Sequence, residues 1–206
     1  MNARTEFRQW LDLEITPTLT NAGFHRRGLK YLRETSETVL MVAFQISRSS
    51  TADEVEFNLY GGVCSNRLLE HDSMLLERSP HESIGLIDCQ VQIPLFVLLG
   101  EQVERWWSIS PGSSQETGRQ FRSWITMLLL PELELRQTDA ALRDDYLTQL
   151  RVQELGPMGL RHLLYLLQTI GPAKEIPLVE SELENASARR LERNMKIIGE
   201  ERVDSG

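Results

Sequence analysis

The first hydrophobic residues of the chain recur at the spacing of an α-helix. They are Phe7, Trp10, Leu11, Ile15 and Leu19. Residues three and four positions apart lie on one face of a helix, so these side chains form a single apolar stripe. Pro17 predicts a kink in this helix, because proline has no backbone N–H to donate, and Gly23 predicts its left-handed stop.

The spacing then changes to the two-residue repeat of β-strands. Five strands are predicted, over residues 29–34, 38–47, 54–62, 89–95 and 103–109. Turn-forming residues such as Ser49, Ser50 and Asp53 separate successive strands. The pattern therefore predicts a mostly antiparallel sheet of about five strands.

Helical spacing returns after residue 112 and continues through the last third of the chain. Ser113 and Glu116 have the spacing of a capping box, which predicts a helix over residues 113–130 that Pro131 ends. Three more helices are expected: one capped by Thr138, one bracketed by Gly156-Pro157 and Gly171-Pro172, and one over residues 180–201.

These elements indicate an α+β fold with helices packed on one face of the sheet and a helical carboxyl-terminal third. We expect one α+β domain over residues 1–172. Residues 173–206 are interpreted as a linker, over 173–179, followed by a peripheral helix, because the apolar stripe after residue 180 is thin.

Strand alternation assigns the sheet residues to two faces. The face expected to pack against helices carries Leu40, Val42, Phe44, Ile46, Val55, Phe57, Leu59, Cys89, Val91, Ile93 and Leu95. The opposite face, here called the polar face, carries Met41, Gln45, Ser47, Glu56, Asn58, Tyr60, Gln90 and Gln92. It is either the solvated side of an antiparallel sheet or a recognition surface, with Tyr60 as its main apolar contact.

A basic turn follows the first helix. Arg26 and Arg27 lie between Gly23 and Gly28, and two guanidinium groups at a turn can bind a phosphate or a carboxylate. The turn lacks a phosphate-binding glycine pattern and leads into a strand. The alternative interpretation is a helix stop followed by a charged first strand.

The remaining chemistry is sparse. A metal site would have to use Cys64, His71, Asp72, His81, Asp88 and Cys89, whose spacing fits no paired ligand motif, so no metal is predicted. Cys64 lies close to two glycines, but no serine stands in a G-x-S-x-G elbow and nothing in the sequence supports a pairing of this thiol with His71, so nucleophilic catalysis is not indicated. At least one residue of Trp106-Trp107 is expected in the core, since adjacent strand residues point to opposite faces.

Several segments of the sequence together resemble the bacterial domain-of-unknown-function family 4304. They are residues 13–28, Tyr31, Arg33, Phe44-Gln45, Phe57-Asn58-Leu59 and Trp106-Trp107. The resemblance spans residues 7–135 and implies a mixed helix and sheet fold. It lends no catalytic residue, and the family's usual arginine near the fourth strand is replaced here by Ile93-Pro94-Leu95-Phe96.

Composition narrows the classes of function. The chain has 206 residues and a net charge of -8, with acidic and basic residues interspersed, which argues against a nucleic-acid partner. It has no secretory signal or stretch long enough for a membrane helix, so a cytoplasmic location is expected. No cofactor motif is present.

Two classes of function remain open. The first is a non-enzymatic protein that binds another protein, such as an immunity or accessory factor, through Gln45, Asn58, Tyr60, Gln90 and Gln92. The second is a small-molecule-binding protein or hydrolase with a pocket between the sheet and residues 70–85, drawing on Arg26, Arg27 and residues 64–81. The absence of a visible catalytic constellation favours the first.

Overall fold

The computed structural model of the chain describes residues 2–76, 84–110 and 114–203. The chain forms two compact units, Met1–Asp139 and Ala140–Gly206. The units divide earlier than the predicted boundary at residue 172. The first unit holds the sheet and the second is helical, so each is described by itself.

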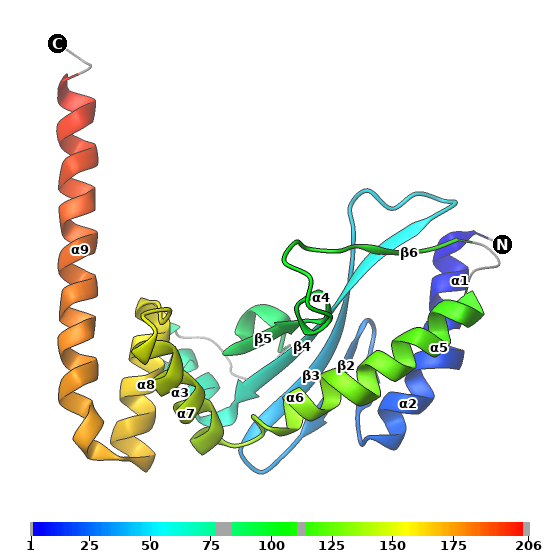
Figure 1. Cartoon of the computed structure of the whole chain (residues 1–206), viewed down its shortest axis with the longest axis horizontal. Helices are drawn as coiled ribbons and strands as arrows, with labels where there is room; N and C mark the ends of the chain where they lie inside the picture. The colour runs from blue at the N-terminus through cyan, green and yellow to red at the C-terminus, as the bar shows by residue number, and fades with distance from the viewer. Residues whose placement is uncertain (1, 77–83, 111–113, 204–206) are drawn as a thin grey trace. The chain divides into compact units, whose positions relative to one another are not determined.

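The first unit is built on an antiparallel sheet (Figure 1). Its strands are β1 His25–Arg27, β2 Lys30–Glu34, β3 Thr38–Ile46, β4 Val55–Ser65, β5 Val91–Pro94 and β6 Trp107–Ile109. The order is β1-β2-β3-β4-β5, and β6 pairs with residues 55–57 of β4. The predicted α+β class with a mostly antiparallel sheet is confirmed.

Two strand predictions and one turn prediction need correction. The strand predicted over 103–109 is only β6, because residues 99–106 form a loop. The strand predicted over 89–95 begins at Val91 and ends at Pro94, because Leu95 starts the short helix α4, Leu95–Leu98. Residues 25–27, read as part of a turn, form the edge strand β1, which pairs with β2 across a tight turn at Gly28.

Two long helical segments cover one face of the sheet, and each contains a π-helical turn. Their parts are α1 Ala3–Trp10, η1 Leu11–Ile15 and α2 Thr16–Asn21, and α5 Ser114–Trp124, η3 Ile125–Leu129 and α6 Leu130–Glu134. Pro17 and Pro131 stand in the first turn of α2 and of α6, directly after these π-turns. Pro131 therefore does not end its helix as predicted, since the widened preceding turn accommodates the missing N–H.

An aromatic core joins these helices to the sheet. Phe7 and Trp10 of α1 contact Phe57 of β4, each with ring centroids 5.2 Å apart. Phe121 of α5 also lies 5.2 Å from Phe57. All four side chains are at most 1% exposed, so this face is the main core predicted from the strand alternation.

A smaller apolar cluster covers part of the opposite face. It consists of Leu32, Val39, Met41, Ala43, Cys64, Leu69 and Cys89, with Ile84 and Leu86 packed against them. Leu69 belongs to α3, Asn66–Leu76, and Leu86 to the 3-10 turn η2, Leu86–Asp88. Cys89 was assigned to the helix-covered face, but it precedes β5 and packs on the opposite side, beside Cys64.

The second unit is a set of helices. They are α7 Asp139–Arg151, α8 Pro157–Ile170, η4 Ala173–Glu175 and α9 Ile176–Val203. Leu160, Leu163 and Leu166 of α8 are buried, as its leucine-rich sequence indicates. The segment predicted as a linker is instead helical from residue 173, and Val179 within it is fully buried. No helix in the described part of the chain is long and apolar enough to cross a membrane.

Candidate functional site

The residues of the predicted polar face differ sharply in exposure. Gln45 and Gln92 are exposed, Tyr60 and Gln90 are half-buried, and Asn58 is fully buried. Met41, also assigned to this face, is fully buried in the smaller apolar cluster. The face is therefore not an open, continuous polar surface.

Asn58 lies where β4 lacks a strand partner on one side. β6 pairs with residues 55–57 and β5 with residues 60–63, so the backbone of Leu59 falls between them. The N–H of Leu59 donates to Oδ1 of Asn58 at 2.8 Å. Asn58 therefore closes a gap in the sheet, which is a structural task.

Glu104 satisfies two members of the polar face at once. Its Oε1 accepts hydrogen bonds from Nδ2 of Asn58 at 3.2 Å and from the hydroxyl of Tyr60 at 2.8 Å. Partial burial, together with the hydrogen bond and the charge of Glu104, raises the pKa of Tyr60 to about 12. The aromatic residue expected to contact a partner is thus held by its own chain.

The two remaining glutamines hold nearby backbone. Gln90 accepts from the N–H of Ser65 at 2.7 Å and donates to the carbonyl of Asp88 at 3.2 Å. Gln92 donates to the carbonyl of Leu86 at 2.9 Å. These bonds attach the segment before β5 to the sheet.

The basic turn contributes one of its two arginines to a cleft. Arg26 is ion-paired with Asp12 and donates from Nε to the carbonyl of Gly28 at 2.8 Å. Its guanidinium also lies over the ring of Tyr31, 5.7 Å from the centroid. Arg27 is exposed and does not line this cleft.

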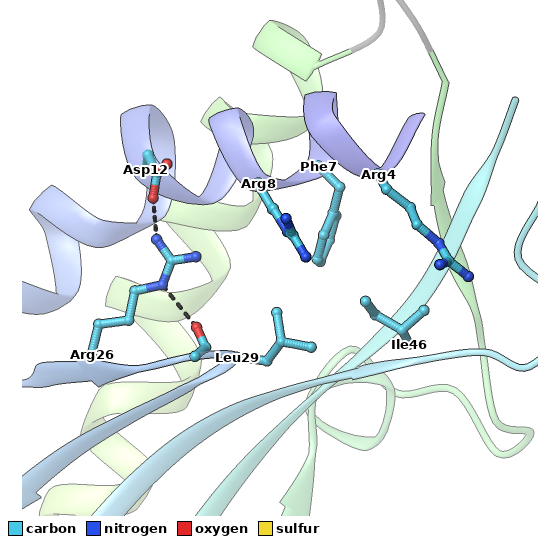
Figure 2. A pocket seen from close by; sticks show the side chains of 8 residues that line it. Arg4, Phe7, Arg8, Asp12, Arg26, Leu29 and Ile46 are labelled. Carbon is cyan, nitrogen blue, oxygen red and sulfur yellow. Dashed lines mark hydrogen bonds and ion pairs between the residues drawn. The ribbon is translucent and has the colours of Figure 1, made fainter. Parts of the chain in front are cut away.

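The cleft has a volume of about 480 Å³ and lies between α1 and the ends of β2 and β3 (Figure 2). We call it the arginine cleft, and its lining residues are Arg4, Phe7, Arg8, Asp12, Arg26, Gly28, Leu29 and Ile46. Phe7, Leu29 and Ile46 supply apolar surface, and three arginines supply charge. An apolar hollow with a few polar groups is the usual form of a binding site.

Arg4 and Arg8 are the distinctive members of the arginine cleft. They lie one turn apart on α1, so both guanidinium groups project from the same side of the helix (Figure 2). Both are exposed, and neither has a hydrogen bond or ion pair with any residue in the described part of the chain. Since Asp12 compensates Arg26, the cleft keeps two uncompensated positive charges in a chain of net charge -8.

The sequence interpretation missed Arg4 and Arg8. It began the first helix at Phe7, so the arginines before and after this residue were not placed on the helix. The available signal was their spacing of four residues, which aligns them with Asp12 along one side of a helix. Their proximity to Arg26 required the fold.

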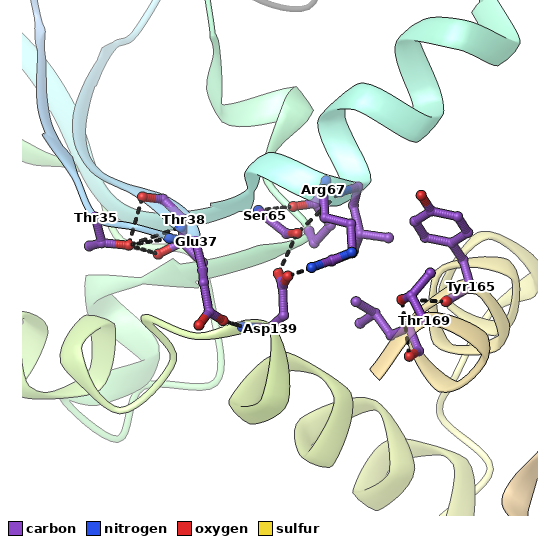
Figure 3. Close-up of polar contacts among 11 residues, drawn as sticks. Thr35, Glu37, Thr38, Ser65, Arg67, Asp139, Tyr165 and Thr169 are labelled. Atoms are coloured by element: carbon purple, nitrogen blue, oxygen red, sulfur yellow. Dashed lines mark hydrogen bonds and ion pairs between the residues drawn. The ribbon is translucent and has the colours of Figure 1, made fainter. Parts of the chain in front are cut away.

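A polar cluster around the buried Ser65 and Asp139 also went unpredicted, but its groups bond to one another (Figure 3). Asp139 accepts from Oγ of Ser65 at 2.6 Å and from Nε of Arg67 at 2.9 Å. The N–H of Asp139 donates to Glu37 at 2.8 Å, and the Ser65 hydroxyl also accepts from the N–H of Leu68. These bonds hold Asp139, the last residue of the first unit, beside the start of β3 and the end of β4.

The cysteines lie inside the protein. Cys64 and Cys89 are free thiols with their sulfur atoms 2.7 Å apart, and both are buried. The hydrogen bond with Cys89 is the main cause of a raised pKa of the Cys64 thiol, and burial of the thiol is the second cause. A thiol in this state is a poor nucleophile, because the reactive form is the thiolate.

The residues considered for a metal site are only partly placed. His81 lies outside the described residues, and His71 pairs with Asp72 at 3.3 Å. Among the residues that the structure describes, no three His, Cys, Asp or Glu side chains are grouped to hold a metal ion.

Comparison with known proteins identifies a family. The sequence model of the domain of unknown function DUF4304 matches residues 15–126, more than half of the chain, and the protein belongs to this family. No curated protein and no solved structure matches the chain. The family match covers Arg26 and Leu29 but begins after Arg4 and Arg8.

Proposed function

We propose that this DUF4304 protein is a non-catalytic binding protein that captures an acidic segment of another protein in the arginine cleft. The observation that supports this proposal is the pair of uncompensated arginines, Arg4 and Arg8, beside an apolar floor. An immunity or accessory factor acts by occupying its partner and needs no reacting groups. The cleft supplies what such a role requires.

Charge favours an acidic ligand. Guanidinium groups bind carboxylates through paired hydrogen bonds, and such charge-assisted bonds are about twice as strong as neutral ones. The rest of the chain carries an excess of acidic residues, so an acidic partner is repelled by most of the surface and attracted at this cleft. This difference in charge between the cleft and the rest of the surface disfavours binding of an acidic partner anywhere else on the protein.

The apolar floor favours a ligand that is more than a small inorganic anion. Phe7 is buried at the base of the cleft, while Leu29 and Ile46 are half-exposed toward it. A ligand with apolar side chains between its carboxylates would cover this surface. An acidic peptide with interspersed aliphatic residues has this chemistry.

The test compares two double variants of equal charge. Arg4→Ala with Arg8→Ala removes the free guanidinium groups of the cleft. Arg119→Ala with Arg161→Ala removes two exposed arginines elsewhere that also have no partner among the described residues. Peptides selected by phage display from an acidic library against the wild type are then measured by fluorescence polarisation.

We expect the cleft variant to lose at least about tenfold in affinity, the effect of losing one charge-assisted hydrogen bond. The control variant should stay within about twofold, because distant surface charges are screened by salt. Equal losses of affinity in both variants would show that binding depends only on the net charge of the protein, and would contradict the proposal. Selection of no acidic peptide would also contradict it.

A further inference from the structure

The arginine cleft contains an unpaired strand edge. Directly after β3, the N–H of Ser47 donates to the carbonyl of Glu56 at 2.9 Å, so the backbone of Ser47 faces β4. Hydrogen-bonded and non-hydrogen-bonded pairs alternate in antiparallel sheets, so the adjacent pair of Ile46 and Phe57 is not hydrogen-bonded. The backbone N–H and C=O of Ile46 therefore point away from β4.

On that side of β3 the neighbouring strand has already ended. The last bond between them runs from the N–H of Phe44 to the carbonyl of Leu29 at 2.9 Å. There the chain turns at Gly28, whose φ of +66° is in the left-handed region that glycine favours. β3 thus extends two residues beyond Phe44, the last residue that bonds on this side, and no residue in the described part of the chain bonds to the backbone of Ile46.

The free edge and the free charges meet in one place. Ile46 lines the arginine cleft together with Arg4 and Arg8, which approach it from α1 (Figure 2). Arg4 also lines a second hollow of about 280 Å³ with Ser50 and Thr51, which follow β3 along the chain. The positive charges therefore flank the line along which a strand beside β3 would run.

We propose that the acidic segment binds in extended form, as a short strand added to the edge of β3 at Ile46. This inference rests on the proposed function and specifies how the partner is recognised. The backbone of the segment pairs with the N–H and C=O of Ile46, and its acidic side chains reach Arg4 and Arg8. Strand addition to an open sheet edge is a general mode of peptide recognition, in which the backbone supplies affinity and the side chains supply specificity.

The probe is a fluorescein-labelled peptide of eight alternating aspartate and valine residues. Two modified versions carry N-methyl groups on every second amide, one on the aspartates and the other on the valines. In a strand these two sets of amides point to opposite edges, so only one set faces β3. The two modified peptides have the same charge and the same number of methyl groups.

We expect one modified peptide to lose at least about tenfold in affinity and the other to stay within about threefold of the parent. Equal affinities of the three peptides, or equal losses by both modified ones, would overturn strand addition. If binding in those cases still depended on Arg4 and Arg8, the proposed function would stand. Unchanged binding by the Arg4→Ala, Arg8→Ala variant would overturn both.

Amide hydrogen exchange gives a second readout on the intact chain. The amide of Ile46 should exchange at least about tenfold more slowly with saturating peptide, while that of Gln45, which faces β4, should be unchanged. Unchanged exchange at Ile46 would overturn the inference.

A protein variant and a small competitor complete the test. Ile46→Pro removes the free donor without removing a bond to β4, and we expect at least about tenfold weaker binding at unchanged melting temperature. Should this variant fail to fold, the methylated peptides and the exchange measurement still decide. Full competition by succinate at the same molar concentration as the peptide would show a small-anion site and overturn a peptide ligand.

Discussion

The predicted polar face and the arginine cleft differ in where their hydrogen bonds go. Asn58, Tyr60, Gln90 and Gln92 bond to Glu104 or to neighbouring backbone within the first unit. The side chains of Arg4 and Arg8 bond to no described residue. A polar side chain therefore signals a binding site only when its own chain leaves it unsatisfied, because a satisfied group has little to offer a ligand.

Among the residues of the polar face, we expect the largest loss of stability from substitution of Asn58. Asn58→Ala should destabilise the protein by about 2–3 kcal/mol, since it leaves the buried N–H of Leu59 without an acceptor. Urea unfolding measures the change. Gln45 is the matched control, because it pairs with Asn58 across β3 and β4 but is exposed. Gln45→Ala should cost less than about 0.5 kcal/mol, and equal costs would show that Asn58 has no special structural task.

Tyr60 should show a smaller effect of the same kind. Tyr60→Phe removes only the hydroxyl that donates to Glu104, and we expect a loss of about 0.5–1.5 kcal/mol. In a Glu104→Gln background the same substitution should cost less, because the charged acceptor is gone. Peptide binding in the arginine cleft should be unchanged in all three variants. Weaker peptide binding by these variants would show that Tyr60 takes part in binding.

Titration of the Tyr60 hydroxyl gives a second test of its hydrogen bond to Glu104. Its folded-state pKa of about 12 lies above the ordinary value of 10, so the neutral phenol is the form that the fold stabilises. This contribution to stability is fully present below pH 10 and is lost as the pH rises through 12. Phenolate absorbance, taken as the difference between wild type and Tyr60→Phe, reports this titration. In Glu104→Gln it should shift to lower pH, and an unchanged midpoint would contradict the role of Glu104.

The smallest stability effect is expected in the arginine cleft itself. Arg4→Ala with Arg8→Ala should change the free energy of unfolding by less than about 0.5 kcal/mol, because neither side chain has an internal partner to lose. Arg26→Ala provides the contrast. It removes the ion pair with Asp12 and the bond to Gly28, and should cost about 0.5–1 kcal/mol. A large loss of stability in the double variant would show that Arg4 and Arg8 stabilise the folded protein.

The order of the elements was readable from the sequence because hydrophobic periodicity is a local property. The stripe of Phe7, Trp10 and Leu11, the alternation in β3 and β4, and the turn at Gly23 each depend on neighbouring residues alone. The boundaries were less secure. Pro131 reads as a helix end, but packing of Leu129 and Leu133 near Gly61 keeps the chain helical through it.

The candidate site depended on contacts between segments that the sequence keeps apart. Glu104 is 46 residues from Asn58, and their bond removes Asn58 from the binding surface. Ile46 has a free strand edge because β2 begins only at Lys30, after the turn at Gly28. It lies beside Arg4 and Arg8 because α1 packs on β3 and β4. The sequence by itself determined which side chains could bind an acidic ligand; the tertiary structure decided which of them remain unpartnered, because hydrogen-bond satisfaction is set by proximity in space.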